Sequence, residues 1–218
     1  GAGTLTKSIL KLNVNKIILI EKDKSLIKLL QNLKEKHNSI EIYNKDALSL
    51  PIWKLGVSPR EVIANLPYNI STKILINLLK NSSQFSKLTM MFQKEVANRI
   101  IAKPGSKTYS RLSVITQLKT KAKILFDIPD TAFFPKPKVQ SSLVQFIPYE
   151  NKRHNFDFEK MEELTRFVFS KKRKMLRTIF KKEGGSSFLN SINVYPNIRP
   201  ENLTLEEFCK LEFALRKH

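Results

Sequence analysis

An amide, a proline and an aromatic ring follow one another at the end of a short apolar segment, in the tetrapeptide Asn65-Leu66-Pro67-Tyr68. The Asn65 carboxamide oxygen and the Leu66 carbonyl can accept two hydrogen bonds from one amino group, while Pro67 restricts the backbone. The Tyr68 ring offers a stacking face. This combination suits a flat heterocycle with an exocyclic amino group, and adenine is the natural guest. The same residue types are also ordinary strand-to-helix turn chemistry.

Two more groups of residues have the chemistry of nucleotide binding. The chain opens with the glycine loop Gly1-Ala2-Gly3, and Glu21 ends the next predicted strand, where a carboxylate can hold ribose hydroxyls or simply be solvated. Asp46 follows a later strand and could accept a hydrogen bond from an adenine amino group, or equally cap a helix. Because ligands of open α/β sheets bind at the carboxyl ends of the strands, these residues and Asn65 predict one ligand-binding edge.

Apolar periodicity predicts alternating strands and helices as far as Pro148, and helices alone beyond it. We therefore expect an α/β domain over residues 1–149 and a small all-α domain over residues 150–218. The predicted strands cover residues 16–20, 40–43, 62–65, 88–92, 112–118, 121–127 and 142–146. The predicted helices cover residues 25–36, 71–80 and 159–169, a segment through 96–100, and a final helix around 205–215.

The charge of the chain predicts a polyanionic partner. Its 218 residues include 39 Lys and Arg against 19 Asp and Glu, a formal net charge of +20, and nucleic acid is the first candidate partner for such an excess. The hydrophobic content of 41% is sufficient for a buried core. One uninterrupted basic block is the predicted nucleic-acid contact, and it consists of Lys171, Lys172, Arg173 and Lys174 followed by Arg177.

Several other classes of protein are disfavoured. The single Cys209 excludes an intramolecular disulfide framework, and the three histidines are too dispersed to predict a metal site. No apolar run approaches the roughly 20 residues that span a bilayer, and no signal-peptide pattern opens the chain. We therefore expect a cytoplasmic protein that binds no metal and does not insert into a membrane.

The motifs resemble, almost end to end, those of the ribosomal RNA adenine N6-dimethyltransferases. The resemblance rests on Gly1 to Thr6, Ile20 to Asp23, Lys45-Asp46-Ala47-Leu48, Asn65 to Ser71, Phe92-Gln93-Lys94-Glu95-Val96-Ala97, and Phe133 to Ser141. Leu66 and the tail from Phe169 to Arg177 favour the small-subunit branch. That branch uses S-adenosylmethionine to dimethylate two adjacent adenosines near the 3′ end of small-subunit ribosomal RNA. The resemblance implies a Rossmann-like class I methyltransferase sheet.

The same resemblance implies roles for individual residues. The catalytic motif would consist of Asn65, Leu66, Pro67 and Tyr68. Phe133 would close the pocket over the target base, or Phe134 would do so if the register differs by one residue. Without the family resemblance, Phe133 would be interpreted as an ordinary core aromatic residue. The implied cofactor site is Gly1, Ala2, Gly3, Glu21, Asp46, Ala47 and Asn65. The basic block would contact RNA, and the implied partner of the monomeric enzyme is a pre-assembled small subunit.

One departure from the family and three alternatives accompany this interpretation. Members usually have an upstream segment with a Gln-containing cofactor motif, the first strand of the sheet and an acidic-x-Gly-x-Gly turn, whereas this chain begins inside that loop. We therefore expect this chain to lack the first strand and part of the cofactor floor, which puts cofactor binding by these residues alone in doubt. The alternatives are a non-catalytic RNA-binding assembly or transcription factor, a large-subunit ribosomal RNA methyltransferase, and a DNA adenine methyltransferase.

Overall fold

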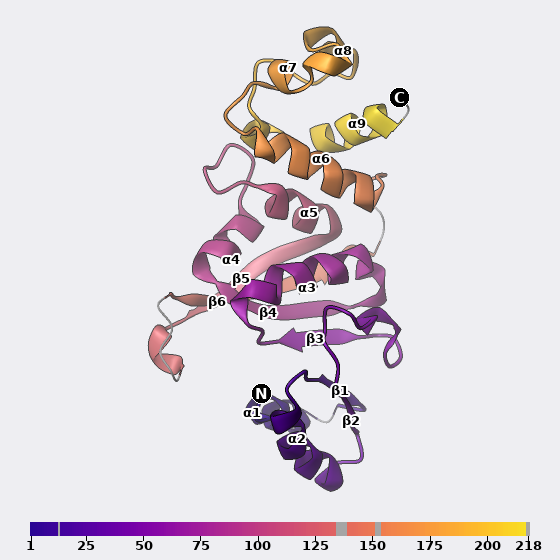
Figure 1. The fold of residues 1–218 in the computed structure, drawn as a ribbon, viewed down its shortest axis with the longest axis vertical. Helices are drawn as coiled ribbons and strands as arrows, with labels where there is room; N and C mark the ends of the chain where they lie inside the picture. Colours follow the sequence, from indigo (N-terminus) through magenta and orange to yellow (C-terminus); the bar gives the residue numbers. More distant parts are fainter. Residues whose placement is uncertain (13, 134–138, 151–153, 217–218) are drawn as a thin grey trace.

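The computed structural model describes residues 1–12, 14–133, 139–150 and 154–216, in which strands and helices alternate before a helical carboxyl-terminal region (Figure 1). The strands are β1 (Ile17–Ile20), β2 (Ile40–Tyr43), β3 (Glu61–Ala64), β4 (Lys87–Gln93), β5 (Thr120–Ile128) and β6 (Ser141–Pro148). The helices are α1 (Thr4–Leu10), α2 (Lys24–Lys36), α3 (Tyr68–Lys80), α4 (Lys94–Ile101), α5 (Arg111–Lys119), α6 (Phe158–Ser170), α7 (Leu176–Ile179), α8 (Ser186–Ser191) and α9 (Leu205–Arg216). Single 3-10 turns lie at η1 (Ile52–Lys54), η2 (Ser82–Gln84), η3 (Asp130–Ala132), η4 (Lys181–Glu183) and η5 (Pro200–Asn202).

The described strands form two sheets. β1 and β2 pair in parallel, and the second sheet has the order β3-β4-β6-β5, in which β3 and β4 are parallel and β6 is antiparallel to both of its neighbours. In Figure 1, β1 lies between β2 and β3, but no described strand pairs with the second edge of β1 or of β3. This is the predicted mixed α/β architecture, in which parallel strands present their carboxyl ends together.

The larger sheet is stabilised by apolar side chains of α3 and of the central strands. Leu75, Leu79 and Met90 are fully buried, and each such side chain contributes about 1.5–3 kcal/mol relative to an exposed one. Phe92 and Phe146 meet edge to face across β4 and β6, with ring centroids 6.0 Å apart. The packing fixes the end of β4, and thereby the turn into α4.

The predicted strand over residues 112–118 is wrong, because this segment is helix α5. Its apolar and β-branched residues resemble a strand in sequence. However, five of its nine residues are buried, so no solvated face reveals the helical period. The capping box decides the conformation: the Ser110 N–H donates to Ser113 Oγ at 3.0 Å, and Ser113 Oγ donates to the Arg99 carbonyl at 2.5 Å.

The carboxyl-terminal helices pack directly on the α/β part. The Tyr109 ring meets the Phe169 ring edge to face at 6.0 Å, and ion pairs join Arg111 of α5 to Glu162 of α6 and Lys80 of α3 to Glu159 of α6. The buried side chains form a continuous core from the sheet into these helices. Figure 1 places α7 and α8 at the opposite end of the molecule from β1 and β2.

The α5 cap gives a stability prediction. Ser113 is fully buried and bonds two segments, so Ser113→Ala should lower the free energy of unfolding by about 1–3 kcal/mol, measured by urea denaturation. The matched control is Ser187→Ala on an exposed position of α8, which should change it by less than about 0.5 kcal/mol. Equal effects of the two substitutions would show that the cap does not determine α5.

Candidate active site

The loop after β3 carries the predicted catalytic motif. Val62 and Ile63 favour an extended strand, and Pro67, with φ −52° and ψ 134°, ends the extended backbone and precedes the first residue of α3, Tyr68. Asn65 is exposed. Among the described residues, nothing hydrogen-bonds to its side chain or to the Leu66 carbonyl. Both acceptors therefore remain available to a ligand.

Tyr68 is tied to the far side of the same sheet edge. Its hydroxyl lies 2.6 Å from Ser141 Oγ, and its carbonyl accepts a hydrogen bond from the Ser71 hydroxyl at 3.0 Å. Ser141 is fully buried at the start of β6, where it is the register partner of Gln93 on β4 and of Ile128 on β5. The hydroxyl of Tyr68 is thus held where three strands meet, and its position is set by the sheet.

Phe133 follows η3 and is half-buried. Its N–H donates to the Asp130 carbonyl at 3.3 Å. No ring pairing between Phe133 and Tyr68 occurs among the described residues, and the register alternative, Phe134, lies outside them. The role of Phe133 stays a prediction.

Glu21, at the carboxyl end of β1, is brought together with the glycine loop. The Gly1 amino group donates to Glu21 Oε2 at 2.5 Å, and the Asp23 N–H donates to Oε1 at 2.9 Å. Burial pushes the pKa of Glu21 upward, but these hydrogen bonds outweigh it and hold the pKa below its ordinary value. The side chain is 19% exposed, so it is an anchored carboxylate rather than a solvated strand end.

Asp46 caps a turn rather than a helix. Its Oδ1 accepts from the Leu48 N–H at 2.9 Å, and its Oδ2 pairs with the Lys22 ammonium at 2.9 Å. The Leu48 hydrogen bond and the Lys22 ion pair hold the pKa of the Asp46 carboxyl below its ordinary value. Ala47 is half-buried beside it. Asp46 therefore lies next to the strand end that carries Glu21.

Asn44 was not predicted as a site residue, although it joins the two strand ends. Its side-chain amide donates to the carbonyls of Glu21 and Lys22, at 2.9 and 3.2 Å. An Asn directly after a strand, followed by Lys-Asp, was the available signal. Gly3 has φ +85°, a backbone conformation that residues with a side chain rarely adopt, and an added Cβ would lie 2.5 Å from Leu33 Cδ1, so the leucine side chain would have to move.

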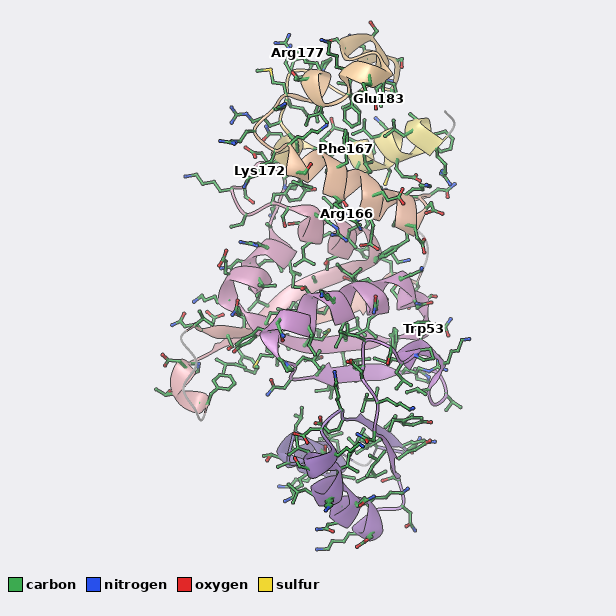
Figure 2. The ribbon with its side chains drawn as sticks, viewed as in Figure 1. Trp53, Arg166, Phe167, Lys172, Arg177 and Glu183 are labelled. Atoms are coloured by element: carbon green, nitrogen blue, oxygen red, sulfur yellow. The ribbon has the colours of Figure 1, made fainter. Side chains whose placement is uncertain are left out.

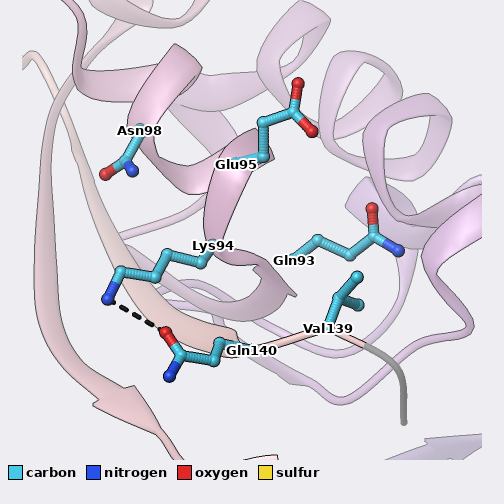
Figure 3. Close-up of a pocket in the computed structure, with 6 residues that line it drawn as sticks. All are labelled: Gln93, Lys94, Glu95, Asn98, Val139 and Gln140. Atoms are coloured by element: carbon cyan, nitrogen blue, oxygen red, sulfur yellow. Dashed lines mark hydrogen bonds between the residues drawn. The ribbon is translucent and has the colours of Figure 1, made fainter.

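A pocket of about 370 Å³ lies where β4 turns into α4 (Figure 3). One of its residues, Gln93, is the register partner of Ser141, which bonds the Tyr68 hydroxyl. Lys94 spans one wall of the pocket. Its ammonium pairs with Asp127 Oδ2 at 2.7 Å and donates to Gln140 Oε1 at 3.2 Å. The pocket is lined by Gln93, Lys94, Glu95, Asn98, Val139 and Gln140.

The basic block forms the turn between α6 and α7, which we call the basic turn (residues 171–174). Lys172, Arg173 and Lys174 are exposed, and none of them forms an ion pair with another described residue. Lys171 instead lies over the Phe167 ring, 4.0 Å from its centroid. Figure 2 shows Lys172 at the end of α6 and Arg177 near α7, on the part of the molecule farthest from β1 and β2.

Comparison with known proteins assigns the family. The family model described as ribosomal RNA adenine dimethylase matches residues 1–217. The chain belongs to this family. It is 39% identical to the ribosomal RNA small subunit methyltransferase A of Ehrlichia ruminantium, covering 97% of this chain and 82% of that protein. It is 43% identical to the protein of the same name from Wolbachia pipientis, covering 97% and 81%.

Two solved methyltransferase structures share the fold. A dimethyladenosine transferase from Plasmodium falciparum matches with a TM-score of 0.82 and 28% identity, over 100% of this chain and 88% of that one. The 23S rRNA methyltransferase ErmE matches with a TM-score of 0.69 and 20% identity, over 99% and 88%, and shows the fold alone. The predicted Rossmann-like class I methyltransferase fold is confirmed.

The bond between Tyr68 and Ser141 can be measured by a double-mutant cycle. Because the two hydroxyls bond only to one another among the described side chains, removing both should cost less than the sum of the single changes. We expect a coupling of about 1 kcal/mol between Tyr68→Phe and Ser141→Ala in urea unfolding. Strictly additive effects would mean that the bond does not hold the Tyr68 ring.

Proposed function

We propose that this protein uses S-adenosylmethionine to dimethylate N6 of two adjacent adenosines near the 3′ end of small-subunit ribosomal RNA. The observation that carries the proposal is a pair of acceptors, Asn65 Oδ1 and the Leu66 carbonyl, that no described residue hydrogen-bonds and that precede the tethered Tyr68 ring. Family membership and the small-subunit names of the relatives support the same substrate.

The residues at the ends of β1 and β2 fit the proposed cofactor. The Glu21 carboxylate accepts a hydrogen bond from the Asp23 N–H and still has lone pairs for ribose hydroxyls. Asp46 can accept the adenine amino group. When bound, S-adenosylmethionine supplies an electrophilic methyl group and leaves as a neutral thioether.

The catalytic residues in this proposal act mainly by orienting the adenosine. The N6 lone pair is delocalised into the purine ring, so it must be turned toward the methyl donor. Asn65 Oδ1 and the Leu66 carbonyl accept the two N6 hydrogens and favour a more tetrahedral nitrogen. The same oxygens stabilise the positive charge that develops on N6. Pro67 limits the movement of both acceptors.

Aromatic stacking holds the target base outside the RNA helix. Extruding a base from the helix costs a few kcal/mol of free energy. Stacking of the extruded base on an aromatic side chain stabilises it by about 1–3 kcal/mol. Tyr68 provides one face, fixed by its bond to Ser141, and Phe133 provides the opposite face. For the second methylation the monomethylated nitrogen keeps one hydrogen, which either acceptor can bind.

The basic turn and Arg177 position the RNA. Their exposed charges suit phosphate contacts, because double-stranded RNA displays little readable base identity. We assign catalysis to residues 1–149 and RNA docking to residues 150–218. The substrate is a pre-assembled small subunit, and the protein acts as a monomer in the cytoplasm. No described helix is long and apolar enough to cross a membrane.

Asn65→Ala tests the catalytic assignment. Losing one acceptor should lower kcat by about 100- to 1,000-fold, measured as dimethyladenosine by mass spectrometry of nucleosides from undermethylated small subunits. Stability should not change, because Asn65 is exposed and its side chain bonds to no described residue. Asn32→Ala, on an exposed position of α2, is the matched control and should retain full activity. Full activity in Asn65→Ala would refute the role of this carboxamide.

The basic turn gives a separate prediction about RNA affinity. Replacing Lys172, Arg173 and Lys174 with alanine should weaken binding to small subunits and reduce the slope of log K against log salt by about 2–3. The control is the triple replacement of Lys24, Lys28 and Lys36 on α2, which removes the same charge at the other end of the molecule. If both triple variants reduce the slope equally, the RNA contact is not localised to the turn.

A further inference from the structure

We propose that the pocket between β4, α4 and the start of β6 holds the base of the adenosine next to the one being methylated. This inference rests on the proposed function. The pocket is distinct from the Asn65-Leu66-Pro67-Tyr68 motif, and its residues are Gln93, Lys94, Glu95, Asn98, Val139 and Gln140.

The distance between the two sites suits two adjacent nucleotides. Gln93 ends β4, which pairs in parallel with β3 in the register Ala64 to Met90, and Asn65 directly follows β3. Neighbouring strands lie about 4.8 Å apart and residues rise about 3.3 Å along them, so Asn65 and Gln93 lie within roughly 10 Å. Ser141, the register partner of Gln93, also bonds the Tyr68 hydroxyl. The pocket therefore adjoins the ring on which the target base would stack.

Two carboxamides in the pocket are free to read a base. Neither Gln93 nor Asn98 hydrogen-bonds through its side chain to another described residue. A carboxamide presents a donor beside an acceptor, the pattern that matches N6 and N7 of adenine. In Figure 3, Gln93 and Val139 stand together on one wall, and Asn98 stands with Lys94 and Gln140 on the other. A base entering between the walls would meet an apolar surface at Val139, which is 40% exposed.

Lys94 is held in place to bind the phosphate between the two nucleotides. Its ammonium has three donors, of which Asp127 and Gln140 take two, and the third remains available. Asp127 is itself fixed by the Ser142 hydroxyl at 2.6 Å. Glu95 is paired with Arg99, which reduces its repulsion of an incoming phosphate.

The position of this pocket on one side of the catalytic motif has an asymmetric consequence. When one of two adjacent adenosines is the target, its partner lies on the 3′ side, and when the other is the target, its partner lies on the 5′ side. The pocket can hold a neighbour from only one of these directions. Replacing the neighbouring adenosine should therefore impair methylation of one adenosine and leave the other almost unaffected.

The test uses the full-length protein and small subunits reconstituted with RNA in which either adenosine is replaced by uridine. For one of the two substrates we expect the kcat/KM of the wild-type protein to fall about tenfold, the value of one lost bidentate base contact. The double variant Gln93→Ala/Asn98→Ala should not distinguish that substrate from the native one. The matched control is Gln31→Ala/Asn32→Ala on exposed positions of α2, which should discriminate as the wild type does.

A binding measurement separates this inference from the proposed function. With 2,6-diaminopurine at the neighbouring position, a fluorescent base that keeps the N6 amino group and N7, the fluorescence should change on binding of the wild-type protein and not of Gln93→Ala/Asn98→Ala, whether or not methyl transfer occurs. Absence of dimethyladenosine on native subunits would defeat the proposed function alone. Discrimination at both adenosines or at neither, or an unchanged fluorescence response in the double variant, would overturn the neighbouring-base pocket.

Discussion

The common edge at which β3, β4 and β6 meet is the constraint on which the rest of the site depends. Parallel pairing brings the carboxyl ends of β3 and β4 together, and the antiparallel β6 begins at that same edge with Ser141 opposite Gln93. The 2.6 Å contact between Tyr68 and Ser141 then ties the first residue of α3 to the start of β6. The motif Asn65-Leu66-Pro67-Tyr68 is thereby held rigidly by the sheet. Catalysis by orientation of the substrate requires such a rigid position.

The residues proposed for cofactor binding, catalysis and RNA binding lie in three different parts of the molecule. Glu21 and Asp46 are anchored at the ends of β1 and β2 by Asp23, Leu48 and Lys22, whereas the basic turn lies beyond α6 at the opposite end (Figure 1). The catalytic motif lies between them. Long-range attraction of RNA therefore need not disturb the carboxylates that fit the cofactor, because the two charge systems are far apart compared with the screening length of about 8 Å.

The sequence predicted those features that local chemistry determines. The tetrapeptide Asn65-Leu66-Pro67-Tyr68 predicted a turn with two hydrogen-bond acceptors and an aromatic ring. The apolar runs of β1 and β4 predicted strands. The hydrogen bond between Tyr68 and Ser141 could not be predicted from the sequence, because these residues are 73 positions apart. Helix α5 was mistaken for a strand because its burial removes the amphipathic period, and the Ser113 cap that forms it depends on the Arg99 carbonyl of another helix. Asn44 and the pocket at Gln93 likewise required the register of the strands.

The most direct measurement of the central claim is a structure of the protein with S-adenosylmethionine or an unreactive analogue and an RNA containing the two adenosines. The account predicts that N6 of the bound adenosine lies within about 3.2 Å of both Asn65 Oδ1 and the Leu66 carbonyl. It also predicts that the base stacks on Tyr68 while the bond to Ser141 persists. An N6 held by other acceptors, or a base lying away from the ends of β3 and β4, would contradict it.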